Sequence, residues 1–284
     1  MNYRHAFHAG NFADVFKHAV LARLIEYLKR KEGAFRVVDT HAGIGRYDLQ
    51  ASEATRTGEW QGGIARIAEA RFKPEVEALL APYRSAVDAL NPNGGLRFYP
   101  GSPLVTRHLL RKQDRLSALE LHPEDAETLR TVFAGDHQAR VIELDGWLAM
   151  GAHLPPKEKR GLVLIDPPFE QPGEFERMAE ALATAHRRWP GGIYAFWYPI
   201  KDLAAVNRYR ESLAGLGIPK ILDTWLTIRG STDEAGLIGS GMAIINPPFT
   251  LEQELATLLP ALCQCLAEDK GASSGTRWLA GEHG

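Results

Sequence analysis

The sequence predicts an α/β fold in which helices cover both faces of a parallel sheet. Short apolar runs that stop at polar or turn residues predict strands at residues 36–39, 116–121, 141–144, 162–165 and 193–197. Apolar residues at helical spacing predict helices around them, most clearly at residues 12–31, 123–133 and 174–188. Strands that alternate with helices form parallel sheets. A ligand then binds at the carboxyl ends of the strands, so the residues that end the strands are the candidates for a site.

The composition is that of a soluble globular protein, with 45% hydrophobic and 24% charged residues among 284. A chain of this length forms one large domain or two modest ones and buries a sizeable core. Its apolar runs are too short to span a bilayer, and residues 1–17 lack the apolar segment of a secretory signal. Two cysteines, Cys263 and Cys265, cannot form a disulfide framework. We therefore expect a cytoplasmic protein with no membrane partner and two inert cysteines in a helix.

The charge balance does not indicate a protein that is wrapped in nucleic acid. The chain has 33 Lys and Arg against 35 Asp and Glu, a net charge of −2. Two local segments are basic. The first, residues 1–34, has six Lys and Arg against three Asp and Glu, and is either a face for an anionic partner or an ordinary solvated surface. The second is either a phosphate contact or the basic side of an ordinary helix, and consists of Arg107, Arg111, Lys112 and Arg115.

Residues 48–115 interrupt the alternation of strands and helices. Glycines and prolines surround amphipathic stretches at residues 64–71 and 75–90, which predicts a mostly helical insertion after the first strand. The prediction is a sheet domain made of residues 1–47 and 116–284, with residues 48–115 as an insertion subdomain. The tail, residues 270–284, is either a last edge strand or a frayed end.

The first strand ends in an acid and a turn with two glycines, Asp39-Thr40-His41-Ala42-Gly43-Ile44-Gly45. Such a turn lets a nucleotide-like cofactor approach the backbone closely, although a plain turn has the same pattern. The dinucleotide fingerprint requires a third glycine and an acid about 20 residues further on. Both are missing here, which disfavours an NAD-dependent oxidoreductase.

The strongest motif is Asp166-Pro167-Pro168-Phe169 at the end of the fourth strand. It is similar to motif IV of methyltransferases that act on amino groups. The exocyclic amine of adenine is a poor nucleophile, because its lone pair is delocalised into the ring. The Asp166 carboxylate and the Pro167 carbonyl can accept its two N–H bonds and localise that pair. Phe169 can stack on the base and align it with the methyl group.

A second copy of the pattern, Asn246-Pro247-Pro248-Phe249, competes for the catalytic role. Asn can replace Asp in this motif, so local sequence does not choose between the copies. The catalytic loop of a methyltransferase follows the fourth strand, and Asp166 occupies that place. We therefore assign the chemistry to Asp166 and a structural corner to Asn246.

Two more strand-end acids fit S-adenosylmethionine as the cofactor. Glu120 can accept both ribose hydroxyls, and Asp145 can accept the adenine amino group beside Gly146, which leaves room for the ring. Each acid could instead cap a helix.

The N-terminal segment concentrates aromatic, imidazole and cationic side chains, in the run from Tyr3 to Asp14 and in Lys17-His18. Such a cluster can stack on and pair with RNA. His5, His8, His18 and His41 are also metal-ligand types, but their spacing matches no metal motif, so we expect no metal site.

These segments together resemble the RlmJ family of bacterial 23S ribosomal RNA adenine-N6 methyltransferases. The resemblance extends over almost the whole chain. It is carried by the N-terminal run, Asp39–Gly43, Arg56-Thr57-Gly58-Glu59, Tyr99-Pro100-Gly101-Ser102-Pro103, Glu120-Leu121-His122-Pro123, Asp145-Gly146, Ile165–Phe169 and Trp197-Tyr198-Pro199. One departure is Phe169, where the family usually has Tyr; stacking survives that change, and a role for the phenol does not.

The resemblance implies a Rossmann-like class I methyltransferase sheet, 23S ribosomal RNA as the partner and no obligate protein partner. It implies that Asp166 is catalytic and that Tyr3 touches the RNA. The implied S-adenosylmethionine site consists of His18, His41, Ser102, Glu120, Asp145, Gly146 and Asp166. The insertion becomes a candidate RNA contact.

Two alternatives remain at this point. A related enzyme could methylate adenine in DNA or a glutamine amide in a protein, since these use similar motifs. A non-catalytic RNA-binding or ribosome assembly factor could retain the same cofactor fold. The intact Asp166 and the ordered strand-end acids argue against the second alternative.

Overall fold

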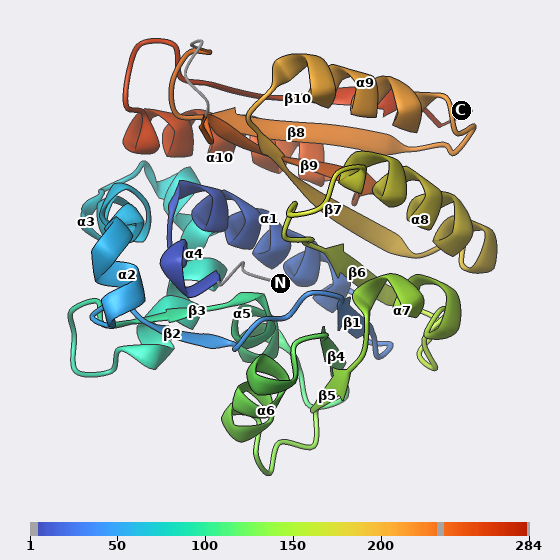
Figure 1. The fold of residues 1–284 in the computed structure, drawn as a ribbon, viewed down its shortest axis with the longest axis horizontal. Coiled ribbons are helices and arrows are strands. Elements are labelled where there is room, and N and C mark those ends of the chain that lie inside the picture. The colour runs from blue at the N-terminus through green and yellow to red at the C-terminus, as the bar shows by residue number, and fades with distance from the viewer. Residues whose placement is uncertain (1–4, 232–235, 283–284) are drawn as a thin grey trace.

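A sheet of eight strands runs through the molecule in the computed structural model, which describes residues 5–231 and 236–282 (Figure 1). The strand order is β10-β8-β9-β7-β6-β1-β4-β5. Tyr3 lies outside the described residues. The strands are β1 (Arg36–Asp39), β4 (Arg115–Glu120), β5 (Ala139–Glu143), β6 (Gly161–Ile165), β7 (Ile193–Ile200), β8 (Ile221–Thr227), β9 (Gly239–Ile245) and β10 (Ser273–Ala280).

The five strands predicted from the sequence are confirmed, and they pair in parallel as β5-β4-β1-β6-β7. The chain order reverses between β1 and β6, which is the switch point where ligands bind in doubly wound sheets. The rest of the sheet corrects the prediction of a parallel sheet. β9 is antiparallel to both β7 and β8, and β10 is antiparallel to β8. The tail is therefore an edge strand.

Helices cover both faces of the sheet, as predicted. Alternating side chains of one strand enter different cores: Val37 packs with the helices of one face and Val38 with those of the other. The first face holds α1 (Phe12–Lys29), α4 (Pro74–Leu90), α5 (Ser102–Leu109), α6 (Pro123–Val132) and α10 (Leu251–Leu266). The second holds α7 (Gly146–Ala152), α8 (Glu174–Arg188) and α9 (Leu203–Ala214). Within the described residues, no helix has the length and apolar character needed to cross a membrane.

Helix α1 is buried along almost its whole length, charged residues included. The Asn11 side chain caps its first turn by accepting from the backbone N–H of Asp14 at 3.0 Å. One side of α1 packs on the sheet, and another packs on α4, α5 and α10. Because the helix is enclosed, Asp14, Lys17 and His18 are all buried within it. Buried charges persist only when they are paired, so these residues need partners.

The insertion is mostly helical, as predicted, with α2 (Ser52–Thr57), the 3₁₀ turn η2 (Glu59–Gly62), α3 (Ile64–Glu69), α4 and α5. Figure 1 shows α2, α3 and α4 beside α1. Its apolar side chains, such as Ile64 and Leu80, belong to the same core as α1 and the sheet, so the insertion extends the main core. It also contains an antiparallel ribbon that the sequence did not predict, formed by β2 (Arg46–Asp48) and β3 (Phe98–Pro100).

Candidate active site

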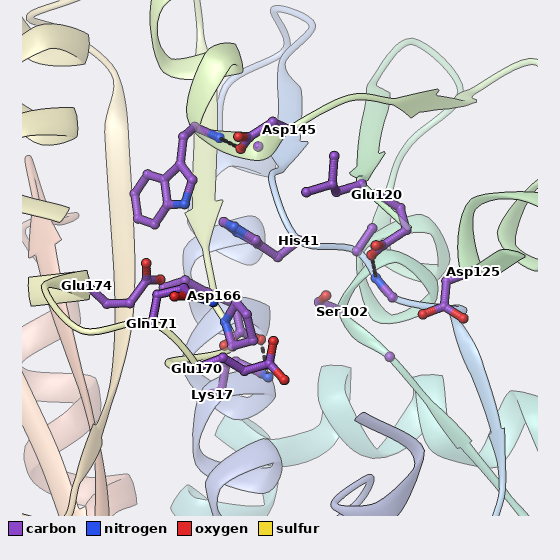
Figure 2. A pocket seen from close by; sticks show the side chains of 18 of the residues that line it. Lys17, His41, Ser102, Glu120, Asp125, Asp145, Asp166, Glu170, Gln171 and Glu174 are labelled. Carbon is purple, nitrogen blue, oxygen red and sulfur yellow. Dashed lines mark hydrogen bonds and ion pairs between the residues drawn. The ribbon is translucent and has the colours of Figure 1, made fainter. Parts of the chain in front are cut away.

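A cavity of about 330 Å³ lies at the carboxyl ends of β1, β4 and β6 and at the loop after β5. Eight of the residues predicted from the sequence line it: His18, His41, Ser102, Glu120, Asp145, Gly146, Asp166 and Pro167. Figure 2 shows Glu120 and Asp125 on one side, Asp166, Glu170 and Glu174 on the other, and His41 and Ser102 between them. The residues at or after the strand ends, Glu120, Asp145, Gly146, Asp166 and Pro167, therefore lie at one cavity, together with His18, His41 and Ser102, which the resemblance implied.

The Asp166 carboxylate is held by a buried lysine. The Nζ atom of Lys17, on α1, lies 2.5 Å from Asp166 Oδ2 and 2.8 Å from Asp14 Oδ1. Burial alone would lower the pKa of Lys17, but the carboxylates of Asp14 and Asp166 outweigh it and raise that pKa above its ordinary value. The Lys17 ammonium also lies 5.6 Å from the centroid of the Trp197 ring. Lys17 is therefore a permanent cation that fixes the Asp166 side chain.

The loop after Asp166 places its prolines and its aromatic ring differently. Pro167 and Pro168 line the cavity. Phe169 has a left-handed backbone, with φ of 52°, and does not line the cavity. Its ring instead packs edge-on against Phe175 and Trp197, at centroid distances of 5.1 and 6.0 Å. Stacking of Phe169 on a base stays a prediction, because the structure shows this ring against aromatic neighbours beside the cavity.

Glu120 is oriented by two backbone amides. Its Oε2 accepts from Gly43 N–H and its Oε1 from His122 N–H, both at 2.9 Å. Burial raises the pKa of Glu120, and these two hydrogen bonds oppose the increase. Each carboxylate oxygen keeps further acceptor capacity on the cavity side, which suits hydroxyl donors such as those of a ribose.

Asp145 and Gly146 begin α7 at the cavity wall. Asp145 caps the helix by accepting from Trp147 N–H at 2.9 Å, so the helix-cap reading of this acid is correct and does not remove it from the cavity. A Cβ at Gly146 would lie 2.1 Å from the Thr40 carbonyl oxygen. The glycine is therefore required by the close approach of the β1 loop, a more immediate reason than room for a ligand ring.

Two histidines line the cavity: His41 is uncharged, and His18 is hydrogen-bonded to a tyrosine. Burial lowers the pKa of His41 to about 4, so its ring is neutral at pH 7, and it meets Trp147 edge-on at 5.4 Å. His18 Nδ1 and the Tyr99 hydroxyl lie 2.8 Å apart, and the Tyr83 hydroxyl follows at 3.0 Å. Burial raises the pKa of both tyrosines, so the phenols stay protonated partners.

Ser102 and Asp39 show how the first strand supports the cavity. Ser102 is the first residue of α5, where the positive end of the helix dipole meets the cavity. Asp39 ends β1 and is fully buried, and within the described residues neither of its carboxylate oxygens has a hydrogen-bond partner. Burial raises the pKa of Asp39 to about 7, while Ser102, a nearby hydroxyl, opposes the increase. Asp39 therefore lies behind the cavity wall and does not form part of it.

Several residues that line the cavity were not predicted from the sequence. Arg177 lies with its guanidinium 5.6 Å from the Trp147 ring and 3.2 Å from Glu174. Asp125, Glu170, Gln171, Tyr47 and Lys17 also line the cavity. A usable signal existed only for Lys17, because Asp14 and Lys17 lie three residues apart on a helix too apolar to leave charges unpaired.

The N-terminal segment is anchored on the insertion. His8 Nδ1 lies 2.9 Å from Glu59 Oε1, and Asn11 Nδ2 donates to Glu59 Oε2 at 3.0 Å. The hydrogen bond with Glu59 raises the pKa of His8. Within the described residues, no three His, Cys, Asp or Glu side chains form a group that could hold a metal ion.

The second predicted basic face lies away from the cavity. Arg115 begins β4, at the opposite edge of the sheet from the carboxyl ends. Arg107 pairs with Asp136 at 2.5 Å, and Arg111 pairs with Asp114 at 2.8 Å while donating to carbonyls of residues 29–33. These arginines mainly hold loops together. A phosphate contact from this group would be remote from the cavity. Cys263 and Cys265 lie on α10, as predicted.

Comparisons of this chain with known proteins agree on one family. The model of the family described as ribosomal RNA large subunit methyltransferase D, RlmJ, matches residues 32–280. The chain is 43% identical to ribosomal RNA large subunit methyltransferase J of Escherichia coli and 42% identical to that of Haemophilus influenzae, over 99% of this chain and all of each relative. A crystal structure of a Legionella pneumophila protein, 32% identical, covers 95% of this chain and 98% of its own with a TM-score of 0.86. The strand order and these matches confirm the Rossmann-like class I methyltransferase fold. The chain belongs to the RlmJ family of ribosomal RNA large subunit methyltransferases.

Proposed function

We propose that this protein transfers a methyl group from S-adenosylmethionine to an adenine N6 of 23S ribosomal RNA. The observation that carries the proposal is the Asp166-Pro167 loop, which ends the fourth strand of the sheet and lines the cavity formed by the other strand-end acids. The relatives are named for methylation of large-subunit ribosomal RNA. We therefore also propose that the protein is cytoplasmic, because its ribosomal RNA substrate is located there.

The cavity residues fit S-adenosylmethionine by their chemistry. The volume of about 330 Å³ lies in the usual range for small-molecule sites. The lining is rich in carboxylates, which suits a cofactor that carries a sulfonium and an ammonium group. When bound, that cofactor supplies a methyl group on a positively charged sulfur. Glu120 would accept from the ribose hydroxyls and Asp145 from the adenine amine, while His18, His41, Ser102 and Gly146 would complete the site.

The catalytic loop would activate the target amine by geometry. The Asp166 carboxylate and the Pro167 carbonyl would accept the two N–H bonds of adenine N6, which directs the nitrogen lone pair toward the methyl group. Lys17 would hold the carboxylate in this position through their 2.5 Å contact. Proline at position 167 fixes the backbone and offers no competing N–H. Phe169 would support this loop through its packing on Phe175 and Trp197.

The target adenine must leave its stack to reach this loop, which costs a few kcal/mol unless the base is already unpaired. The RNA must therefore be held outside the cavity as well as inside it. The insertion, residues 48–115, and the N-terminal segment with Tyr3 are the surfaces that we propose for this contact. His8 and Asn11 already tie that segment to the insertion through Glu59.

The test is transfer of labelled methyl from S-adenosylmethionine to unmodified 23S ribosomal RNA, with genomic DNA and the Asp166→Ala variant measured in parallel. We expect label on an RNA adenine from the wild type only. Label on DNA alone would instead identify a DNA adenine methyltransferase. Cofactor binding with no transfer to either nucleic acid would favour a binding or assembly factor that retains the fold.

A further inference from the structure

The β2–β3 ribbon connects the cavity to the outer surface. Side chains alternate along a strand, so Tyr47 is buried and lines the cavity while Arg46, the residue before it, is exposed. On the other strand, Tyr99 pairs with Tyr47 and is buried, and Phe98 pairs with Asp48. Tyr47 therefore faces the cavity, whereas Arg46 and Phe98 lie on the other side of the same short ribbon, with Arg46 one residue before Tyr47 in the chain.

On this outer side, the guanidinium groups of Arg46 and Arg97 both lie against the ring of Phe98. The guanidinium carbons of Arg46 and Arg97 lie 5.1 and 4.9 Å from the centroid of the Phe98 ring. The Arg97 side chain is 59% exposed and also donates to Asp48 Oδ2 at 3.2 Å. Arg46 makes no ion pair with any described residue. Stacking on an aromatic ring orients a guanidinium while its N–H edges remain available to a ligand.

The cavity itself offers little to attract a polyanion. Carboxylates surround it, including Glu120, Asp145 and Glu174. Among the described residues of its lining, both the lysine and the arginine are already engaged: Lys17 with Asp14 and Asp166, and Arg177 with Glu174. An RNA strand that brings its adenine to Asp166 would meet repulsion at this rim. Cations beside the rim are needed to offset that repulsion.

We propose that Arg46 and Arg97, held on Phe98, bind backbone phosphates of the RNA whose adenine enters the cavity. The proposal rests on the proposed function, which identifies the polyanion as substrate RNA. Guanidinium groups bind phosphate oxygens in a bidentate manner, and phosphate contacts set the position of the strand without reading its sequence. Arg46 and Arg97 are thus positioning residues, and their loss should weaken RNA binding more than turnover.

The test compares Arg46→Ala/Arg97→Ala with a matched double variant, Arg140→Ala/Arg187→Ala. Arg140 and Arg187 are exposed and lie near the start of β5 and the end of α8, at the opposite edge of the sheet. We measure KM and kcat on a fragment of unmodified 23S ribosomal RNA, and its affinity as a function of salt. For the ribbon variant we expect KM to rise about tenfold, with kcat at saturating RNA within about twofold of wild type. The slope of log affinity against log salt should fall by roughly 1.4 to 1.8, the value for two lost phosphate contacts.

The matched variant should keep the KM and the salt slope of wild type. An unchanged KM and slope in the ribbon variant would overturn the inference, as would an equal effect of both double variants. Arg97→Ala also removes the contact with Asp48, so Arg46→Ala alone, with S-adenosylmethionine affinity as the check on folding, gives the cleaner comparison. If Arg46→Ala lowers cofactor affinity and leaves the RNA affinity intact, the inference is wrong. Failure of wild type to methylate the RNA would overturn the proposed function itself, which separates the two results.

Discussion

Two loops of this chain share one sequence pattern and differ in almost everything else. Asp166–Phe169 and Asn246–Phe249 each follow a buried apolar strand, and both continue as Pro-Pro-Phe. Asp166 lies at the cavity, 2.5 Å from a buried lysine. Asn246 donates through Nδ2 to the carbonyls of Pro190 and Gly192, at 2.7 and 2.8 Å, at the opposite edge of the sheet.

The direction of the strand before each loop causes this difference. The first loop follows β6, which is parallel to β1, and the second follows β9, which is antiparallel to β7. The carboxyl ends of β6 and β9 therefore point to opposite edges. Their aromatic rings differ accordingly: the Phe169 ring packs on Phe175 and Trp197, whereas Phe249 is 82% exposed. A local motif acquires a role only from the edge at which the sheet places it.

The largest effect should come from Asp166. We expect Asp166→Ala to abolish methyl transfer, and Asp166→Asn to lower kcat by about 10²- to 10⁴-fold, because an amide is a weaker acceptor and has no charge for Lys17 to hold. Labelled-methyl transfer at saturating cofactor measures this. In the matched variant, Asn246→Ala, activity should be retained. Loss in Asn246→Ala with activity retained in Asp166→Ala would assign the chemistry to the second loop.

The next largest effect should be the difference between Ala substitutions at Phe169 and at Phe249. Phe169→Ala removes the ring packed on Phe175 and Trp197, and we expect kcat/KM to fall by about tenfold or more, because the catalytic loop loses its support. Phe169→Tyr should keep activity, since the ring face is preserved. Phe249→Ala should change neither activity nor the free energy of unfolding by more than about 0.5 kcal/mol, because that ring is exposed. Equal activity in Phe169→Ala and wild type would exclude a supporting role for the ring.

Asn246 should affect stability and not catalysis. Asn246→Ala leaves the carbonyls of Pro190 and Gly192 without their donor, and we expect the free energy of unfolding to fall by about 1–3 kcal/mol in a denaturant titration. Asn246 also has φ of 52°, which Asn tolerates better than Ala. Asn246→Gly should therefore recover part of the loss. Asn93→Ala, at an exposed loop position, serves as the control, and an equal loss there would refute the anchoring role.

The smallest effect concerns a second contrast, between Asp166 and Asp39, two acids that end neighbouring strands. Lys17 pairs with Asp166, whereas burial raises the pKa of Asp39 from 3.8 to about 7. Between these pH values the folded state binds more protons at Asp39 than the unfolded state, so this group makes stability fall as pH rises from about 4 to about 7. Between pH 5 and pH 8, the free energy of unfolding should fall less in Asp39→Asn than in wild type. If the free energy of unfolding falls equally in both proteins, Asp39 does not cause the pH dependence.

Much of the fold followed from local patterns. The strands that end at or shortly before Asp39, Glu120, Asp145 and Asp166 were predicted in the right order, because a buried strand is short, apolar and closed by a polar residue. The helix at residues 174–188 was predicted with the bounds that α8 has. The edge of the sheet at which these acids meet followed from the parallel arrangement.

The missing parts depend on contacts between distant residues. The β2–β3 ribbon pairs Arg46 with Pro100, and each of its strands has only three residues, too few for a periodic pattern. The position of the Phe169 ring depends on Trp197, which comes from the next strand. In both places the sequence holds the residues but no signal of their partner.

The sequence by itself determined which residues end the strands and which of them can accept hydrogen bonds or carry charge, because strand period and side-chain chemistry are local properties. The tertiary structure decided that β9 runs against β7, so that Asn246 serves as an anchor and Asp166 lies at the cavity. It also decided that Lys17 meets Asp166 from a position 149 residues away. Strand direction and buried ion pairs are set by the packing of the whole core, and no local stretch of sequence records them.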